Sequence, residues 1–165
     1  MGARGIYLSQ ECHLVNLVPP VSVAGGKTSG VFNMKNHAHA SIILQFGVTS
    51  AALKSVQVYS SDNGSPASTT AIPFNLHACE TAYDAADGDV LGARQAIAAT
   101  GFAPSDTDNI FYVVEVDADT LPAGENYVEL VLTDESPAAS SVLASAVVVL
   151  SGARYAEDQS DTVLT

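Results

Sequence analysis

The chain has 165 residues, with 18 Asp and Glu against six Lys and Arg, and a formal net charge of −12. It therefore lacks the clustered Lys and Arg that phosphate binding needs, and we expect neither a nucleic acid nor an anionic membrane surface as its partner. Hydrophobic residues make up 47% of the sequence and charged residues only 15%, a balance that favours one folded domain over disorder.

Strand signals recur along the chain, while helix signals are almost missing. Apolar and polar residues alternate with a period of two in several segments, the pattern of a strand with one packed face and one wet face. The clearest strands are expected at residues 41–48, 54–59, 74–79, 110–118, 127–132 and 142–150, with weaker candidates near 29–34 and 94–100.

The segment from Val142 to Leu150 has the strongest apolar character. It is apolar at every position except Ser145, which predicts a strand buried on both faces. Its nine residues are far fewer than the roughly 20 that cross a bilayer, so no membrane span is expected.

Turn clusters separate these segments, as in Asp62-Asn63-Gly64 and Leu121-Pro122-Ala123-Gly124. Short strands joined by turns, with no helices between them, predict an all-β fold: an antiparallel β-sandwich of the jelly-roll kind, with about eight strands. We place this domain at residues 31–155, after an N-terminal arm at 1–30 and before an acidic C-terminal tail at 156–165.

The N-terminal arm, residues 1–30, contains Pro19-Pro20 and Gly25-Gly26 among scattered apolar residues, a pattern that favours an arm or an edge strand over a core element. Such residues seek burial, so we expect the arm to grip a neighbouring protein and the body to stay folded without residues 1–20. The expected anchors are Leu14, Val15, Leu17 and Val18.

Histidine and cysteine residues form no complete metal motif. His37 and His39 stand two apart, which places both on one face of a strand, but no third ligand is near them in the sequence. Two further pairs, Cys12-His13 and His77 with Cys79, resemble half of a zinc site. We expect surface histidines, free thiols at both cysteines and no bound cofactor.

Acidic residues gather in two loops and on one strand. Ca²⁺ binding by the loop acids is left open, since their spacing is not that of an EF-hand and Asp is also an ordinary turn residue. These loop acids are Asp84, Asp87, Asp89, Asp106 and Asp108. Glu115, Asp117 and Asp119 share a strand face, where we expect a solvated or partner-facing surface rather than a glycosidase pair.

Catalytic motifs are missing from the sequence, and we expect a protein that is not an enzyme. There is no GxSxG, and Gly25-Gly26-Lys27-Thr28 lacks the preceding glycine of a P-loop. A carbohydrate-binding role would need an aromatic platform. The chain has no Trp, and the candidates are Tyr59, Tyr83, Tyr112 and Tyr127.

Three stretches in order resemble small virion proteins of tailed bacteriophages, the capsid decoration or cement proteins. They are residues 41–47 followed by the strand 56–59, residues 110–117 leading into 121–124 and 127–130, and residues 142–155. The resemblance implies a β-fold that oligomerises, often as a trimer, on the outside of an icosahedral shell.

The implied partners are the major capsid protein and further copies of the chain, on a virion that is assembled in the host cytoplasm. Arg154 and Tyr155 are the expected contact residues near the C-terminus. The alternative is a phage tail or head-fibre component with a receptor- or carbohydrate-binding β-sandwich.

Overall fold

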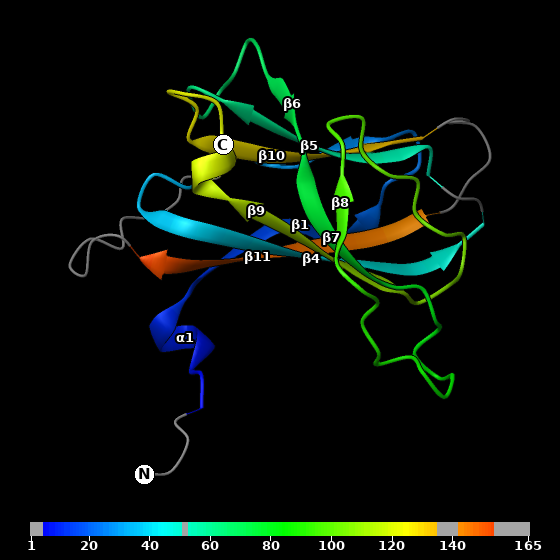
Figure 1. Ribbon diagram of the computed structural model, residues 1–165. Helices are drawn as coiled ribbons and strands as arrows, with labels where there is room; N and C mark the ends of the chain where they lie inside the picture. Colours follow the sequence, from blue (N-terminus) through cyan, green and yellow to red (C-terminus); the bar gives the residue numbers. More distant parts are fainter. Residues whose placement is uncertain (1–4, 51–52, 135–141, 154–165) are drawn as a thin grey trace.

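The computed structural model describes residues 5–50, 53–134 and 142–153. Eleven strands in these residues form two packed antiparallel sheets, drawn in Figure 1. The strands are β1 (His13–Ser22), β2 (Lys27–Thr28), β3 (Phe32–Asn33), β4 (His37–Thr49), β5 (Ser55–Ser61), β6 (Thr70–Ile72), β7 (Phe74–Cys79), β8 (Gln95–Ile97), β9 (Phe111–Asp117), β10 (Tyr127–Thr133) and β11 (Val142–Ala153). The short helices are α1 (Leu8–Glu11) and the 3₁₀ turn η1 (Ala118–Thr120).

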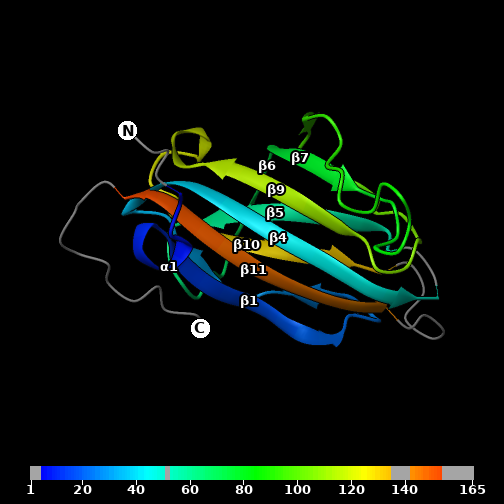
Figure 2. The ribbon, with the colours of Figure 1, turned by 90° about the horizontal axis from the view of Figure 1, so that it is seen from below.

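One sheet has six strands in the order β1-β11-β4-β9-β7-β8, and its outer face is turned toward the viewer in Figure 2. The other has the order β2-β10-β5-β6, with β3 also paired to β10. All the strand pairs are antiparallel. The predicted all-β antiparallel sandwich is confirmed, with more strands than the eight expected.

The core lies between the two sheets because every second residue of the long strands points inward. On β4 these are Ala40, Ile42, Leu44 and Phe46, all at most 2% exposed. Val56 and Val58 of β5 and Val128, Leu130 and Leu132 of β10 fill the opposite side of the same cluster. Burial of these aliphatic side chains is the main force that holds the sheets together.

The prediction that the N-terminal segment lies outside the core is wrong for residues 13–22. Residues His13–Ser22 form β1, an edge strand paired with β11 from His13↔Leu150 to Ser22↔Leu143. Val15, Leu17 and Val18 lie in the core of their own molecule, at 4%, 4% and 1% exposure. The sheet edge offers these side chains burial within the chain, so a neighbouring protein is not needed to cover them.

Pro19 and Pro20 fit this edge position. A proline has no backbone N–H to donate to a neighbouring strand, so it is tolerated where one side of a strand is unpaired. The pairing of β1 with β11 shifts register twice, between Asn16 and Val18 and between Val18 and Val21.

Because Val15, Leu17 and Val18 belong to the core, we expect removal of residues 1–20 to destabilise the body. This is contrary to the sequence-based expectation.

Strand β11 is a second correction, because it is not buried on both faces. Its residues alternate between buried and open, and Leu143 and Val147 remain 45% and 39% exposed. The described residues supply a second layer for only one face of the six-stranded sheet. The other face therefore leaves apolar side chains uncovered.

Helix α1 projects from the body on the side of this uncovered face, as Figure 1 shows. Ile6, Tyr7 and Leu8 are 76%, 57% and 51% exposed. No helix among the described residues is long and apolar enough to cross a membrane.

Candidate functional site

The uncovered face of the six-stranded sheet is the first candidate site. We call Leu14, Ile43, Leu143 and Val147 the open apolar face; they come from β1, β4 and β11 and are 39–48% exposed. Val147 lies opposite Ile43 in the β11–β4 register, and Val113 follows on β9. A concavity of about 370 Å³ lies at the Leu143 end, where Pro20, Val21 and Gly47 also line it.

A hydrogen-bonded chain borders the open apolar face on β4 and β9. His39 Nδ1 lies 2.6 Å from Asp117 Oδ1, and His39 Nε2 lies 2.7 Å from Glu115 Oε2. Ser41 Oγ donates to the same Glu115 oxygen at 2.6 Å. Burial acts to lower the pKa of His39, but the hydrogen bonds to Asp117 and Glu115 and their negative charges outweigh it, so the pKa is raised.

This arrangement argues against nucleophilic catalysis and against a metal site at His39. A carboxylate stands between Ser41 and His39, so the imidazole has no contact through which it would take the serine proton. The two carboxylates also bind opposite nitrogens of one ring and do not converge on a point. Glu115 and Asp117, predicted to form a solvated or partner-facing strand surface, therefore bind His39 of the neighbouring strand. Asp119, predicted on the same strand face, lies in η1.

His37 and His39, considered above as a possible metal pair, have separate partners in the fold. The prediction of a surface histidine is wrong for His37, which is buried and stacks its ring on His13 with the centroids 6.1 Å apart. Burial and the nearby His13 lower the pKa of His37. Its Nδ1 is buried with no hydrogen-bond partner among the described residues.

The other predicted half-sites also remain separate. His77 Nδ1 bonds to the Gly92 carbonyl at 3.1 Å, and the Cys79 thiol donates to the Gly88 carbonyl. Cys12 and Cys79 are free, as expected. Within the described residues, no three His, Cys, Asp or Glu side chains come together as metal ligands would.

The loop acids are also dispersed. Asp84, Asp87 and Asp89 are exposed on the segment that follows β7. Asp108 has a structural role, since its Oδ1 accepts the Thr49 backbone N–H at 2.6 Å, and the Asp106 carbonyl accepts the Thr49 hydroxyl. The expected contact residues Arg154 and Tyr155, and the tail at 156–165, lie outside the described residues.

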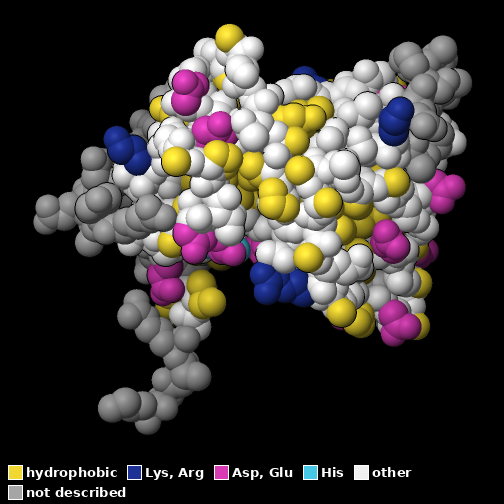
Figure 3. Space-filling view, turned by 45° about the horizontal axis from the view of Figure 1, so that its top comes forward, with side chains coloured by type: hydrophobic (Ala, Val, Ile, Leu, Met, Phe, Trp, Pro, Cys, Tyr) yellow, Lys and Arg dark blue, Asp and Glu magenta, His cyan; other side chains and the backbone are white. Residues whose placement is uncertain are grey.

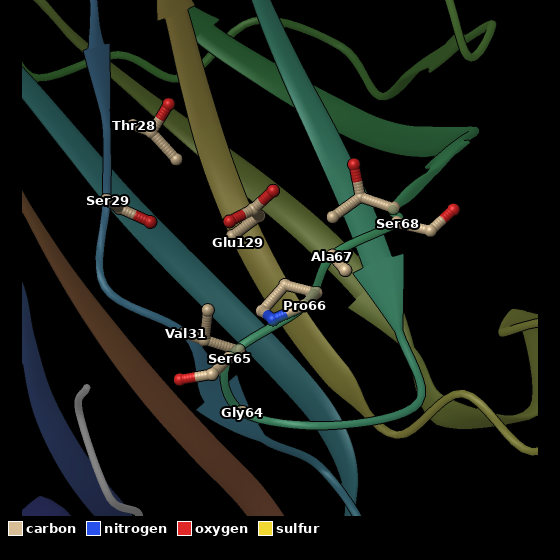
Figure 4. Close-up of a pocket in the computed structure, with 10 residues that line it drawn as sticks. Thr28, Ser29, Val31, Gly64, Ser65, Pro66, Ala67, Ser68 and Glu129 are labelled. Atoms are coloured by element: carbon tan, nitrogen blue, oxygen red, sulfur yellow. The ribbon is translucent and has the colours of Figure 1, made fainter.

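The second candidate site is a hollow of about 580 Å³ on the outside of the five-stranded sheet. Figure 4 shows the Glu129 carboxylate of β10 between Thr28 on one side and the β5–β6 loop on the other. Burial raises the pKa of Glu129. The lining residues are Thr28, Ser29, Val31, Gly64, Ser65, Pro66, Ala67, Ser68, Thr69 and Glu129.

Of the four tyrosines considered for an aromatic platform, two lie on the same sheet face as Glu129. Tyr59 is directly opposite Glu129 in the β5–β10 register, and Tyr127 precedes Glu129 by two residues on β10. Both tyrosines are half-buried, on the outward side of strands whose other residues fill the core. Tyr112, by contrast, is fully buried, and Tyr83 is 73% exposed on a loop.

Sequence reasoning missed this hollow because its walls come from three distant segments. The loop 64–69 contributes small residues typical of turns, residues 28–31 overlap a weak strand candidate, and Glu129 lies on the predicted wet side of a strand. Elsewhere on the surface, the Lys and Arg side chains visible in Figure 3 lie apart from one another, and Asp and Glu side chains are scattered among them.

No protein-family model and no curated protein matches the sequence. Among solved structures, the crystal structure of the SPBc2 prophage-derived protein YomS is similar to this chain, with a TM-score of 0.46 and 11% identity. The match covers 85% of this chain and 95% of that chain. At this level the similarity carries no argument about function.

Proposed function

We propose that the protein is a non-enzymatic structural protein of a phage virion, which binds the outer surface of an icosahedral capsid as an oligomer and stabilises it. The observation that carries the proposal is the open apolar face. The sequence of β11 is that of a strand covered on both sides, yet residues 5–50, 53–134 and 142–153 cover only one of them. A partner that packs on the other side would bury the side chains of the open apolar face.

The open apolar face is assigned to the contact with the major capsid protein. Full burial of an aliphatic side chain contributes roughly 1.5–3 kcal/mol, and these four side chains are already about half covered, so together they would add on the order of a few kcal/mol. The exposed Ile6, Tyr7 and Leu8 stand on the same side of the molecule and would add to this contact.

The test mixes the purified protein with expanded capsids that lack it and measures co-sedimentation. Val147→Arg places a charge on the open apolar face and is expected to weaken capsid binding at least about tenfold. Val90→Arg is the matched control, because Val90 is 58% exposed on a loop and is expected to tolerate the change. Equal binding by the two variants would remove the open apolar face from the contact.

The oligomer is tested on the free protein by light scattering. A trimer has three times the chain mass of 17.0 kDa.

The alternative role is that of a tail or head-fibre component. Labelling of the protein on intact virions distinguishes the two roles, because a decoration protein is found over the whole shell and a fibre component at discrete appendages.

A further inference from the structure

We propose that the hollow around Glu129 is a saccharide-binding site. The walls are Thr28 and Ser29 on one side and the β5–β6 loop, residues 64–69, on the other, with the Glu129 carboxylate between them (Figure 4). This site is on the five-stranded sheet, opposite the open apolar face, and the proposal does not depend on capsid binding.

Glu129 is the first reason for the proposal. The side chain is half-buried, and no hydrogen bond or ion pair joins it to another residue within the described ranges. The nearby acid Glu125 shows the contrast, because Ser60 and Thr70 both donate hydroxyl hydrogen bonds to it. A carboxylate that is partly removed from water and left without donors is ready to accept hydrogen bonds from a ligand.

The surrounding hydroxyl groups define the ligand class. Thr28, Ser65, Ser68 and Thr69 contribute hydroxyls that both donate and accept, whereas the Ser29 hydroxyl is already used between Gly30 and the Leu130 N–H. A saccharide also donates and accepts, and its hydroxyl pairs suit a carboxylate. An ammonium group only donates, and it would occupy little of a hollow of about 580 Å³.

Tyr59 and Tyr127 do not line the hollow itself, but they lie on its sheet face next to Glu129, where they would extend the site as an apolar platform. Tyr59 is the direct cross-strand neighbour of Glu129, a position at which the Cβ atoms stand roughly 5 Å apart. Tyr127 lies on the same face of β10. Aromatic rings with a polar tip bind surfaces that are apolar on one side and wet on the other, as a sugar ring is.

Local hydrogen bonds order the beginning of the β5–β6 loop, at residues 61–65, before any ligand arrives. The Asn63 side chain accepts the Ser65 backbone N–H at 3.0 Å, and the Ser61 hydroxyl donates to the Asn63 carbonyl at 3.0 Å. A loop ordered in this way reduces the ordering cost of binding a weak, polar ligand.

The test uses the full chain on a glycan array, followed by saturation-transfer NMR with the methyl glycosides of the sugars that bind. Glu129→Gln keeps the shape of the side chain but removes the charge, and it should weaken binding at least about tenfold. Asp119→Asn is the matched control, an exposed acid on η1 whose neutralisation should leave binding unchanged.

Three results would overturn the proposal: no saccharide bound by the wild-type protein, equal binding by Glu129→Gln, or binding of n-butylamine in place of any glycoside. Tyr59→Ala provides a second variant, for which loss of binding with an unchanged unfolding midpoint supports the site. Because capsid co-sedimentation is measured separately, failure here is distinguishable from failure of the capsid role.

Discussion

His39 on β4 holds Asp117 on β9 through a contact of 2.6 Å between Nδ1 and Oδ1, and its other ring nitrogen holds Glu115. The two strands are paired in register at this point, with His39 opposite Asp117 and Ser151 of β11 on the other side of His39. One imidazole therefore bridges two acids that would otherwise repel each other on the same strand face.

This bridge predicts that folding stability depends on pH. The pKa of His39 is raised above its usual 6.5, so the protonated ring favours the folded state. The stabilisation is complete below about pH 6.5 and is lost as the pH rises through the pKa of the folded protein. An NMR titration of the His39 ring checks this prediction, and a midpoint at or below 6.5 would contradict it.

The matched variant for this prediction is His39→Gln. It should reduce stability at pH 5.5 more than at pH 8.5, because only the charged imidazole satisfies both carboxylates. Thermal unfolding at the two pH values measures the difference. A loss of the same size at both would mean that the ring acts by packing and not by charge.

Strand β1 is predicted to be part of the folded body. Leu17→Ala should lower the free energy of unfolding by about 2–5 kcal/mol, because Leu17 is only 4% exposed and its truncation leaves a cavity. Leu14→Ala, at a position 48% exposed, should stay within about 0.5 kcal/mol. Urea unfolding of both variants checks this prediction. An unchanged free energy of unfolding for Leu17→Ala would support a detached arm instead.

Tyr112 is predicted to fasten the segment between β7 and β9. Its hydroxyl donates to Glu80 at 2.8 Å and accepts the Ser105 N–H at 2.8 Å. Tyr112→Phe removes both bonds and should cost about 1–3 kcal/mol of stability, with faster amide exchange around Ser105. Tyr127→Phe is the control, since its hydroxyl makes no hydrogen bond within the described residues. Similar losses of stability in both variants would contradict the role of Tyr112.

The sequence predicted the fold well where alternation was strong. The expected strand at residues 74–79 matches β7, and the expected strands near 41–48 and 110–118 match β4 and β9. Period-two alternation is a local property, so it can be seen without knowing which strands pair. Residues 1–30 were predicted only as an arm or an edge strand, and the place of β1 in the core was missed because its alternation breaks at the register shifts between Asn16 and Val18 and between Val18 and Val21.

The candidate sites were harder to predict because they depend on pairing. His39 and Asp117 are 78 residues apart, and only the β4–β9 register brings them together. The hollow at Glu129 likewise depends on β10 lying between β2 and β5. The composition of β11 predicted burial on both faces, whereas its outward apolar residues lie on a face that the described part of the chain leaves uncovered.

The most direct test of the proposed role is electron microscopy of expanded capsids with the purified protein bound. The open apolar face accounts for the binding only if Ile43, Leu143 and Val147 are covered by the shell. We predict ordered density between capsomers, with the six-stranded sheet against the capsid and the Glu129 hollow facing outward. Bound protein with the open apolar face exposed to solvent, or no bound protein at all, would contradict the account.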